Sequence, residues 1–260
     1  MGIKNSQGEY IYFIDSDDFI SENGLKKLYE KAVENNSDLT FCGFNRISDQ
    51  NELIMKYENY FNYLNKNEQK NGLKILSDFL MNKIWICTGS AIYKKNIIKE
   101  HKIFYNQEYS SGEDQHFLMN FLYYSKNISS VNEVLFYYVI HNKGLSTSLN
   151  VFDSIIVFKD FCEFLKKEVD INKELKENIL SIVSIIKKYK IPYLEIRGYY
   201  RIAKMLSWNE YKKLLKKRNL NNKKIKIYKI NKYSIFSFFG MILLKYFPKL
   251  FYKISNKLKK

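Results

Sequence analysis

The stretch EYIYFIDSDD at residues 9–18 decides how this chain is expected to fold. Its first part, Glu9 to Ile14, is rich in β-branched and aromatic residues, which predicts a buried strand. The acidic cluster DSDD follows at the carboxyl end of that strand. Ser21 is a candidate N-cap of a following helix, and Leu39 to Asn45 (LTFCGFN) predicts another strand. A strand, helix, strand series indicates an α/β layer fold with its site at the strand ends.

The chain up to residue 149 continues this mixture of helical and strand patterns. Residues 46–67 are polar with scattered aromatic residues, which predicts an irregular excursion between regular elements. The further helices and strands expected in this part are Gln69–Met81, Ile97–His101, Asp114–Tyr124, Ile128–Val131 and Val134–His141.

Charge is distributed very unevenly along the 260 residues. The formal net charge is +16, yet residues 1–186 carry 21 Lys/Arg against 25 Asp/Glu, a balance of −4. From Lys187 onward, 22 Lys/Arg face only Glu195 and Glu210, a surplus of +20. The two halves are therefore expected to meet different partners.

Composition also limits the class of protein. The hydrophobic share of 46% is enough to bury a core, so the chain is expected to be globular. Three cysteines without metal-ligand spacing predict neither a zinc site nor a disulfide framework. No secretory signal is recognisable, and no window reaches the ~20 apolar residues of a spanning helix. These features favour a cytoplasmic location.

The region after residue 149 is expected to be helical. Residues 151–167, 173–190 and 193–217 show apolar residues at three and four spacing, with Pro192 expected to separate two helices. The final stretch from Ser234 mixes apolar blocks with lysines, as a helix in a membrane interface does. A nucleic-acid patch and a simple solvated surface are alternatives. The grouping of the apolar residues and the absence of a nucleic-acid motif favour the membrane surface.

Asp15, Asp17 and Asp18 place three carboxylates within four residues. Their mutual repulsion is costly unless a positive group lies among them. Hard oxygen ligands suit Mg²⁺ or Mn²⁺, and Mg²⁺ is usually held by one or two carboxylates together with substrate phosphates. The alternative is that these acids cap the following helix or occupy a turn.

Glu113 and Asp114 follow Gly112 at the start of a predicted helix whose apolar side chains would anchor it in the core. A carboxylate in that position could deprotonate a sugar hydroxyl as a general base. Capping of the helix by Asp114 is the alternative interpretation. If both acidic motifs serve one reaction, we expect Asp15 and Asp114 to share a cleft.

Three segments together resemble glycosyltransferase family 2 enzymes of the GT-A fold. MGIKNSQGEYIYFIDSDD at residues 1–18 is similar to the family stretch that runs into its metal-binding DxD motif. SSGEDQHFLMNFL at 110–122 is similar to the later Glu-Asp segment and its apolar helix. LFYYVIHNKGLSTS at 135–148 is similar to the aromatic strand and Ser-rich turn that close the domain. His141 and Lys143 lie where a family member often has a basic residue near the diphosphate, although a solvated turn is an alternative.

The resemblance implies a role for each acidic residue. Asp15 and Asp17 would form the DxD motif that holds Mn²⁺ or Mg²⁺ against the donor diphosphate, with Asp18 supporting. Asp114 would be the catalytic base, and Glu113 would orient the acceptor or the base. The donor would be a nucleotide-sugar, above all a UDP-sugar, and the acceptor a glycan or a lipid-linked glycan. A single displacement would invert the anomeric carbon.

The implied fold is an incomplete GT-A sheet with flanking helices, followed by a helical basic C-terminal region. Its expected parts are the C-terminal part of a GT-A domain at 1–149, a helical appendage at 150–217, and a basic membrane-associating tail at 218–260. Complete family members begin about half a domain earlier, so we expect the first strands of a parallel sheet to be missing. A truncated reading frame and a separate chain that supplies those strands are the two explanations.

Two functions follow from this interpretation. The first is an inverting glycosyltransferase for surface polysaccharide or lipooligosaccharide, peripheral on the inner face of the membrane and bound to its anionic surface. The alternative is an inactive, membrane-associated remnant. Nucleic acid is not an expected partner.

Overall fold

The computed structural model of the chain describes residues 2–64, 71–141, 152–218, 220 and 232–257. The chain forms two compact units, and each is described by itself. The first consists of the described residues of Met1–Gln107 and Glu113–Thr147, and the second of those of Glu108–Gly112 and Ser148–Lys260. The predicted boundary at residue 149 lies outside the described residues.

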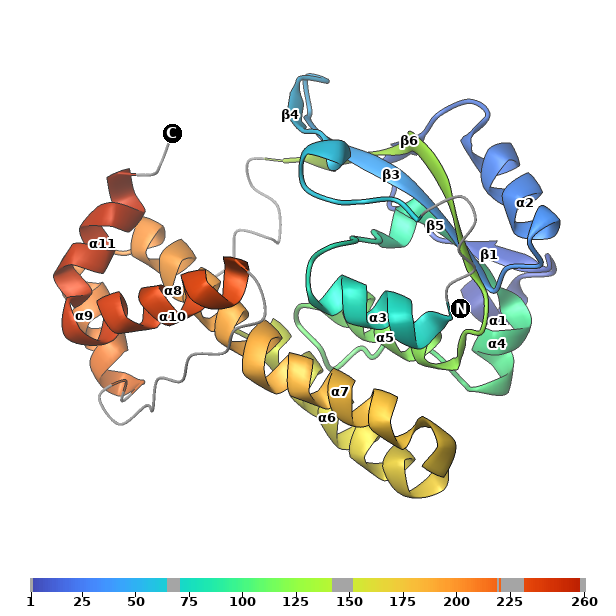
Figure 1. Cartoon of the computed structure of the whole chain (residues 1–260). Helices are drawn as coiled ribbons and strands as arrows, with labels where there is room; N and C mark the ends of the chain where they lie inside the picture. The colour runs from blue at the N-terminus through green and yellow to red at the C-terminus, as the bar shows by residue number, and fades with distance from the viewer. Residues whose placement is uncertain (1, 65–70, 142–151, 219, 221–231, 258–260) are drawn as a thin grey trace. The chain divides into compact units, whose positions relative to one another are not determined.

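The first unit contains a six-stranded mixed sheet (Figure 1). Its strands are β1 Tyr10–Tyr12, β2 Phe19–Ile20, β3 Leu39–Ser48, β4 Leu53–Met55, β5 Ala91–Lys94 and β6 Ile128–Ile140. Their order is β1-β5-β3-β6-β2, with β4 added to β3. β3 and β6 pair in parallel, whereas β5 pairs antiparallel with both β1 and β3. The expectation of a parallel sheet therefore holds only for its centre.

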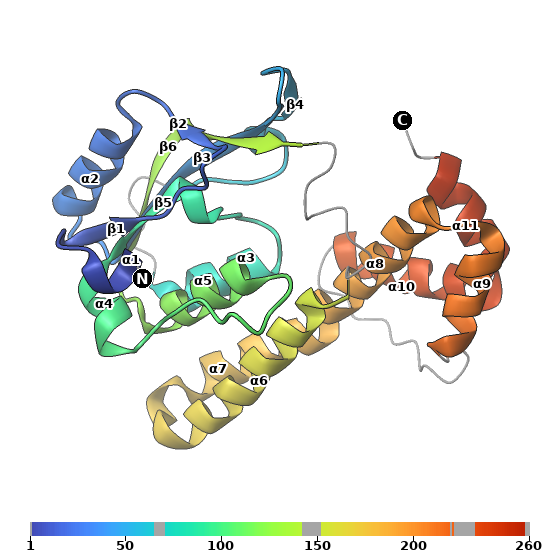
Figure 2. The same cartoon turned by 180° about the vertical axis from the view of Figure 1, so that it is seen from behind.

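Helices lie on both sides of this sheet (Figure 2). The helices of the first unit are α1 Gly2–Asn5, α2 Gly24–Glu34, α3 Gly72–Leu80, α4 Lys95–Glu100 and α5 Glu113–Tyr124, with the 3₁₀ turns η1 Tyr57–Asn59 and η2 Thr88–Ser90. α2 packs on β3 and β6, and α3 packs against α5. An aromatic core fixes α5, because the ring of Phe117 meets those of Phe13 and Tyr93 edge to face at 5.3 and 5.4 Å.

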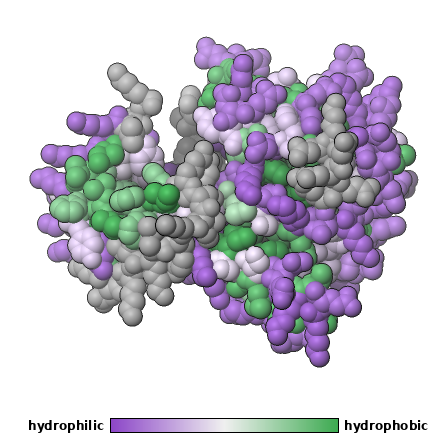
Figure 3. Space-filling model, viewed as in Figure 1, coloured by the Kyte–Doolittle hydropathy of each residue, from purple (hydrophilic) through white to green (hydrophobic). Residues whose placement is uncertain are grey.

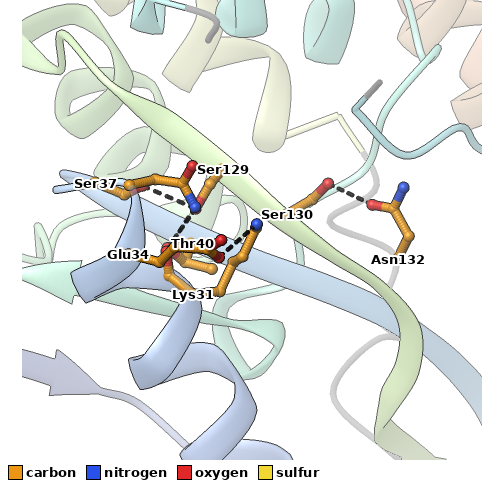
Figure 4. Close-up of polar contacts among 8 residues, drawn as sticks. Lys31, Glu34, Ser37, Thr40, Ser129, Ser130 and Asn132 are labelled. Atoms are coloured by element: carbon orange, nitrogen blue, oxygen red, sulfur yellow. Dashed lines mark hydrogen bonds and ion pairs between the residues drawn. The ribbon is translucent and has the colours of Figure 1, made fainter. Parts of the chain in front are cut away.

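Hydroxyl groups tie β3 to β6 inside the unit (Figure 4). The buried Ser129 hydroxyl accepts a hydrogen bond from Ser37 Oγ at 2.8 Å and lies 2.7 Å from Thr40 Oγ1. Thr40 and Ser129 are register partners in the parallel pair. Each buried hydroxyl is thereby satisfied by another one, which removes the penalty of burying it.

The region predicted as two β segments is one strand. β6 runs through Asn132 and Glu133, which are exposed, and the register with β3 shifts beside Gly43. Ser130 Oγ donates to Asn132 Oδ1 at 2.7 Å at this irregularity. The two predicted β segments stopped on either side of this polar pair, but the pair is an irregularity within a continuous strand.

Other predictions near the acidic motif were partly wrong. The strand expected over Glu9 to Ile14 is limited to β1, where Ile11 is buried, and Ile14 is 46% exposed. Ser21 is not the N-cap of α2, because Asn23 occupies that position and the Ser21 N–H donates to the Leu135 carbonyl at 2.8 Å. The expected irregular excursion contains β4 and η1.

The second unit is helical, as expected. Its helices are α6 Ser154–Ile171, α7 Lys176–Ile185, α8 Ile191–Met205, α9 Trp208–Lys217, α10 Lys232–Tyr246 and α11 Pro248–Lys257, with the turn η4 Lys173–Leu175 and the π-helical turn η5 Ile186–Lys190. Pro192 does not separate two helices: it lies in the first turn of α8, which continues directly from η5. The wider π turn accommodates a proline that lacks a donor N–H.

The final segment forms two helices instead of one. α10 and α11 both pack on α8, and Met241, Leu244 and Phe251 are buried in a core that includes Ile196. Among the described residues, no helix is long and apolar enough to cross a membrane.

Gly72 at the start of α3 is expected to tolerate no side chain. A Cβ there would lie 1.8 Å from the Leu122 carbonyl oxygen and 2.7 Å from that of Ser125, and both atoms belong to the backbone. Gly72→Ala should lower the free energy of unfolding by about 3 kcal/mol, measured by urea denaturation. Gly2→Ala is the matched control, since a Cβ at Gly2 meets nothing within 4 Å. Equal stability of the two variants would contradict this packing.

Candidate active site

The acidic motif lies in the loop between β1 and β2. The Asp18 N–H donates to the Asp15 carbonyl at 3.2 Å, which closes a turn. Asp15 and Asp17 are exposed, whereas Asp18 is half-buried. Asp18 Oδ1 accepts the Val139 N–H at 2.9 Å, so the loop is fastened to β6. The turn therefore presents two carboxylates to solvent and uses the third for anchoring.

His141 lies beside the same motif. Its Nε2 is 3.0 Å from Asp17 Oδ2, and the two side chains are 45% and 47% exposed. The sequence pointed to His141 only as a basic residue that could also belong to a solvated turn. The contact joins the end of β6 to the acidic loop. Lys143, the second basic residue considered, lies outside the described residues.

Glu113 and Asp114 occupy the first turn of α5. Asp114 Oδ1 accepts the N–H of the next residue, Gln115, at 2.7 Å. This is not the N-cap contact, because Asp114 lies inside the helix and a capping side chain accepts the N–H two or three residues ahead. Both residues are half-buried. Because the Phe117 ring anchors this helix in the aromatic core, the position of Asp114 is fixed by packing rather than by a mobile loop.

Electrostatics connects the two acidic motifs. Burial raises the pKa of Asp114 to about 6, and repulsion from Glu113 and Asp15 adds to this effect. Burial also raises the pKa of Asp18 to about 6, with further repulsion from Asp17 and Asp15. Asp15 thus acts on both Asp18 and Asp114. The fold brings together two motifs that are far apart in the sequence.

Several residues around the carboxylates carry no sequence motif, so the sequence did not single them out. The Tyr105 ring stacks on Phe117 at 4.6 Å. Burial raises the pKa of its hydroxyl, and Asp114, Asp15 and Glu113 add to this effect. Cys87 has its pKa raised to about 12 by burial and then by Asp114 and Asp18. Arg46 acts on the same thiol in the opposite direction. Only the fold places these residues beside the acids.

The predicted metal ligands, Asp15 and Asp17, are two exposed carboxylates of one loop. The described residues include no group of three or more His, Cys, Asp or Glu side chains able to hold a metal ion. Asp15 and Asp17 nevertheless offer the exposed hard oxygens that Mg²⁺ or Mn²⁺ accepts. Two carboxylates suffice where substrate phosphates complete the coordination. The residues fit a metal bound jointly with a phosphate ligand, and the metal site stays a prediction.

Asp114 is expected to reduce stability at neutral pH. Its pKa in the folded state, about 6, exceeds the ordinary value of 3.8. The contribution of the Asp114 side chain to the free energy of unfolding is therefore fully present below pH 3.8 and is lost as the pH rises through 6. Asp114→Asn removes this titration and should stabilise the fold at pH 8 by up to about 3 kcal/mol, with the gain shrinking toward pH 4. Urea denaturation across this range measures the difference. A gain that is independent of pH would contradict the assignment, since Asp18 titrates in both proteins.

Known proteins resemble this chain in sequence. A sequence model described as "Glycosyl transferase family 2" matches residues 1–101. The poly(ribitol-phosphate) β-N-acetylglucosaminyltransferase TarP of Staphylococcus aureus is 32% identical over 153 residues, which cover 58% of this chain and 43% of TarP. A poly(ribitol-phosphate) β-glucosyltransferase of Bacillus spizizenii is 31% identical over 143 residues, covering 55% and 20% of the two chains. The chain thus spans less than half the length of these relatives.

A solved structure shows the same fold. Residues 1–349 of Staphylococcus aureus TarS, crystallised in complex with UDP-GlcNAc, superimpose with a TM-score of 0.54 over 98% of this chain and 68% of that chain. The sequence identity is 15%, so this likeness supports the fold alone. Residues 1–101 therefore match the model of glycosyltransferase family 2, and the likeness to TarS shows a sheet of the GT-A type.

Proposed function

We propose that this protein transfers a sugar from a nucleotide-diphosphate donor to a glycan acceptor, with inversion at the anomeric carbon, in the synthesis of a surface polysaccharide or lipooligosaccharide. One observation carries the proposal: the carboxylates of the two family motifs, Asp15 and Asp114, lie within electrostatic range of each other. The names of TarP and the Bacillus spizizenii enzyme describe transfer of a sugar to poly(ribitol-phosphate), a polymeric acceptor.

Asp114 is the proposed general base. A base works best when its pKa lies near the operating pH, and burial raises the pKa of Asp114 to about 6. Its carboxylate takes the proton of the acceptor hydroxyl as the acceptor oxygen bonds to the anomeric carbon. The bond from that carbon to the donor phosphate oxygen breaks, and its electrons leave with the nucleoside diphosphate. Glu113, its neighbour on α5, orients the acceptor or the base.

Asp15 and Asp17 are the proposed donor-side residues, with Asp18 fixing their loop to β6. They would hold Mn²⁺ or Mg²⁺ against the donor diphosphate. When bound, such an ion neutralises charge that develops on the departing diphosphate. The donor-side role of Asp17 requires its carboxylate to exchange part of its contact with His141 for this ligand.

The C-terminal helices are the proposed contact with the inner face of an anionic membrane. Apolar side chains on α10 and α11 stay exposed, as the green surface over these helices in Figure 3 shows. They include Phe236, Phe239, Leu250 and Ile254, which are 52%, 61%, 48% and 39% exposed. Lys249 and Lys253 are exposed beside the last two. Apolar insertion with lysines at headgroup level is how an interfacial helix binds.

Charge distinguishes a membrane from a second copy of the chain as the partner. Residues 211–260 contain 16 Lys/Arg and no Asp or Glu. A second copy would bring the same positive charge to the contact, whereas an anionic leaflet attracts each basic residue by about 1 kcal/mol. The C-terminal helices therefore suit an anionic lipid surface.

The direct test is UDP release from a panel of UDP-sugars, with Mn²⁺ or Mg²⁺ and with a membrane extract as acceptor. Acceptor-dependent release with one donor is the expected result. A sample that is folded, shown by cooperative unfolding, but releases UDP from no donor would favour the alternative of a non-catalytic, membrane-associated remnant.

A further inference from the structure

Arg46 is a positive charge among the carboxylates that the proposed reaction does not yet use. It lies on β3, where the register pairs it with Tyr138 of β6. The next residue on β6, Val139, donates its N–H to Asp18. Arg46 is also the only arginine among residues 1–186. The strand therefore places the cation one residue away from the point where the acidic loop is anchored.

The guanidinium group of Arg46 is held in place but not neutralised. Its Cζ lies 5.9 Å from the centroid of the Tyr138 ring, a cation–π distance. Its Nε is buried and has no hydrogen-bond partner. Within the described part of the chain, no carboxylate forms an ion pair with it. Buried donors and buried charges are normally paired, so this arginine has binding capacity to spare.

The surroundings of Arg46 identify it as part of the same site. Arg46 lowers the pKa of the Cys87 thiol, while Asp114 and Asp18 raise it. Arg46 likewise opposes the effect of Asp18 and Asp15 on the Tyr138 hydroxyl. Arg46 therefore acts on the same thiol and hydroxyl groups as the carboxylates of the acidic motifs, although it forms an ion pair with none of these carboxylates.

We infer that Arg46 binds a phosphate group of a substrate through its guanidinium group. Arginine presents parallel N–H donors that match phosphate oxygens, and a ring face beneath it restricts its orientation. An anionic substrate entering a group of carboxylates needs such a cation to offset their repulsion. This inference rests on the proposed function. The phosphate comes either from the donor diphosphate or from a phosphate-bearing acceptor.

Calorimetric titrations of the full chain distinguish these sources. The probes are UDP, uridine and inorganic pyrophosphate, each with Mn²⁺, and glycerol 3-phosphate as a simple phosphate ester. The variants are Arg46→Met, which removes the charge, and Arg46→Lys, which keeps it without the planar fork. Lys56→Met, an exposed cation just after β4, is the matched control. Unfolding curves establish that each variant is folded.

If the donor diphosphate is the ligand, Arg46→Met should weaken the binding of UDP and of pyrophosphate by about 10- to 100-fold. Arg46→Lys should have an intermediate affinity for both, and the affinity for uridine should not change. If the acceptor phosphate is the ligand, Arg46→Met should weaken only the binding of glycerol 3-phosphate. The inference would be overturned if Arg46→Met bound UDP, pyrophosphate and glycerol 3-phosphate with the same affinities as the unsubstituted chain. A chain that binds pyrophosphate through Arg46 but releases no UDP would instead refute the proposed transfer reaction alone.

Discussion

Replacing Asp114 by asparagine is expected to lower the rate of sugar transfer by about 10²- to 10⁴-fold, the usual contribution of a positioned general base. The amide keeps the size of the side chain but cannot take the proton of the acceptor hydroxyl. Asp114 stands at the start of α5, whose Phe117 is fixed by the rings of Phe13 and Tyr93. The backbone should therefore stay in place. UDP release at saturating donor measures the effect.

The control is Asp49→Asn, which changes an exposed acid at the turn after β3 and should leave the rate unchanged. The pH profile adds a second measurement. In the unsubstituted chain, activity should fall as the pH decreases through about 6, where the pKa of Asp114 lies. A rate for Asp114→Asn within threefold of the unsubstituted chain would remove Asp114 from the reaction.

Removing two aromatic side chains from α10 is expected to abolish most membrane binding. Phe236 and Phe239 are 52% and 61% exposed, so their loss should disturb the core of the second unit little. Each ring contributes about 1.5–3 kcal/mol when it moves from water into an apolar phase. Phe236→Ser combined with Phe239→Ser should weaken binding to vesicles of phosphatidylethanolamine and phosphatidylglycerol by at least about 100-fold. Vesicle sedimentation measures the bound fraction.

Ile54→Ser is the matched control, because Ile54 is 55% exposed on β4 of the first unit. Raising the salt concentration should weaken binding further, since the basic residues act through a screened attraction. Equal sedimentation of the double variant and the unsubstituted chain would contradict a lipid-facing role of α10. If the chain bound vesicles without anionic lipid as strongly as vesicles with it, the role of the lysines would be contradicted.

The sequence predicted the positions of the helix and strand that carry the site more accurately than the contacts between these elements. The apolar spacing after Asp114 identified α5, and the β-rich run before DSDD identified the position of β1. Both signals are local, because they depend on which side chains a helix or strand buries. The length of β1 was overestimated for the same reason: Ile14 has the composition of a buried strand residue but has no partner strand there, and it is exposed.

What the sequence could not reveal depends on pairing between distant segments. The antiparallel placement of β5 between β1 and β3 brings Cys87 and Tyr105 near the carboxylates, and no spacing rule encodes it. The contact of His141 with Asp17 and the place of Arg46 opposite Tyr138 follow from the register of β6. A lone arginine in a strand looks like a surface residue until its neighbours are known.

The continuous helix through Pro192 shows the same limit. A proline in a helical pattern predicts a break, because it lacks a donor N–H. Here the preceding π turn changes the hydrogen-bonding pattern, so the chain continues into α8. By contrast, the blocks of apolar residues in the sequence predicted the exposed apolar face of α10, although α10 also packs on α8.

The most direct test of the central claim, that Asp15 and Asp17 form a metal-dependent donor site, is calorimetric titration of the chain with UDP, with and without Mn²⁺. The account predicts binding that requires the metal and is lost in Asp17→Ala, while Asp49→Ala binds normally. Binding of UDP to the same extent without metal, or unchanged in Asp17→Ala, would contradict it.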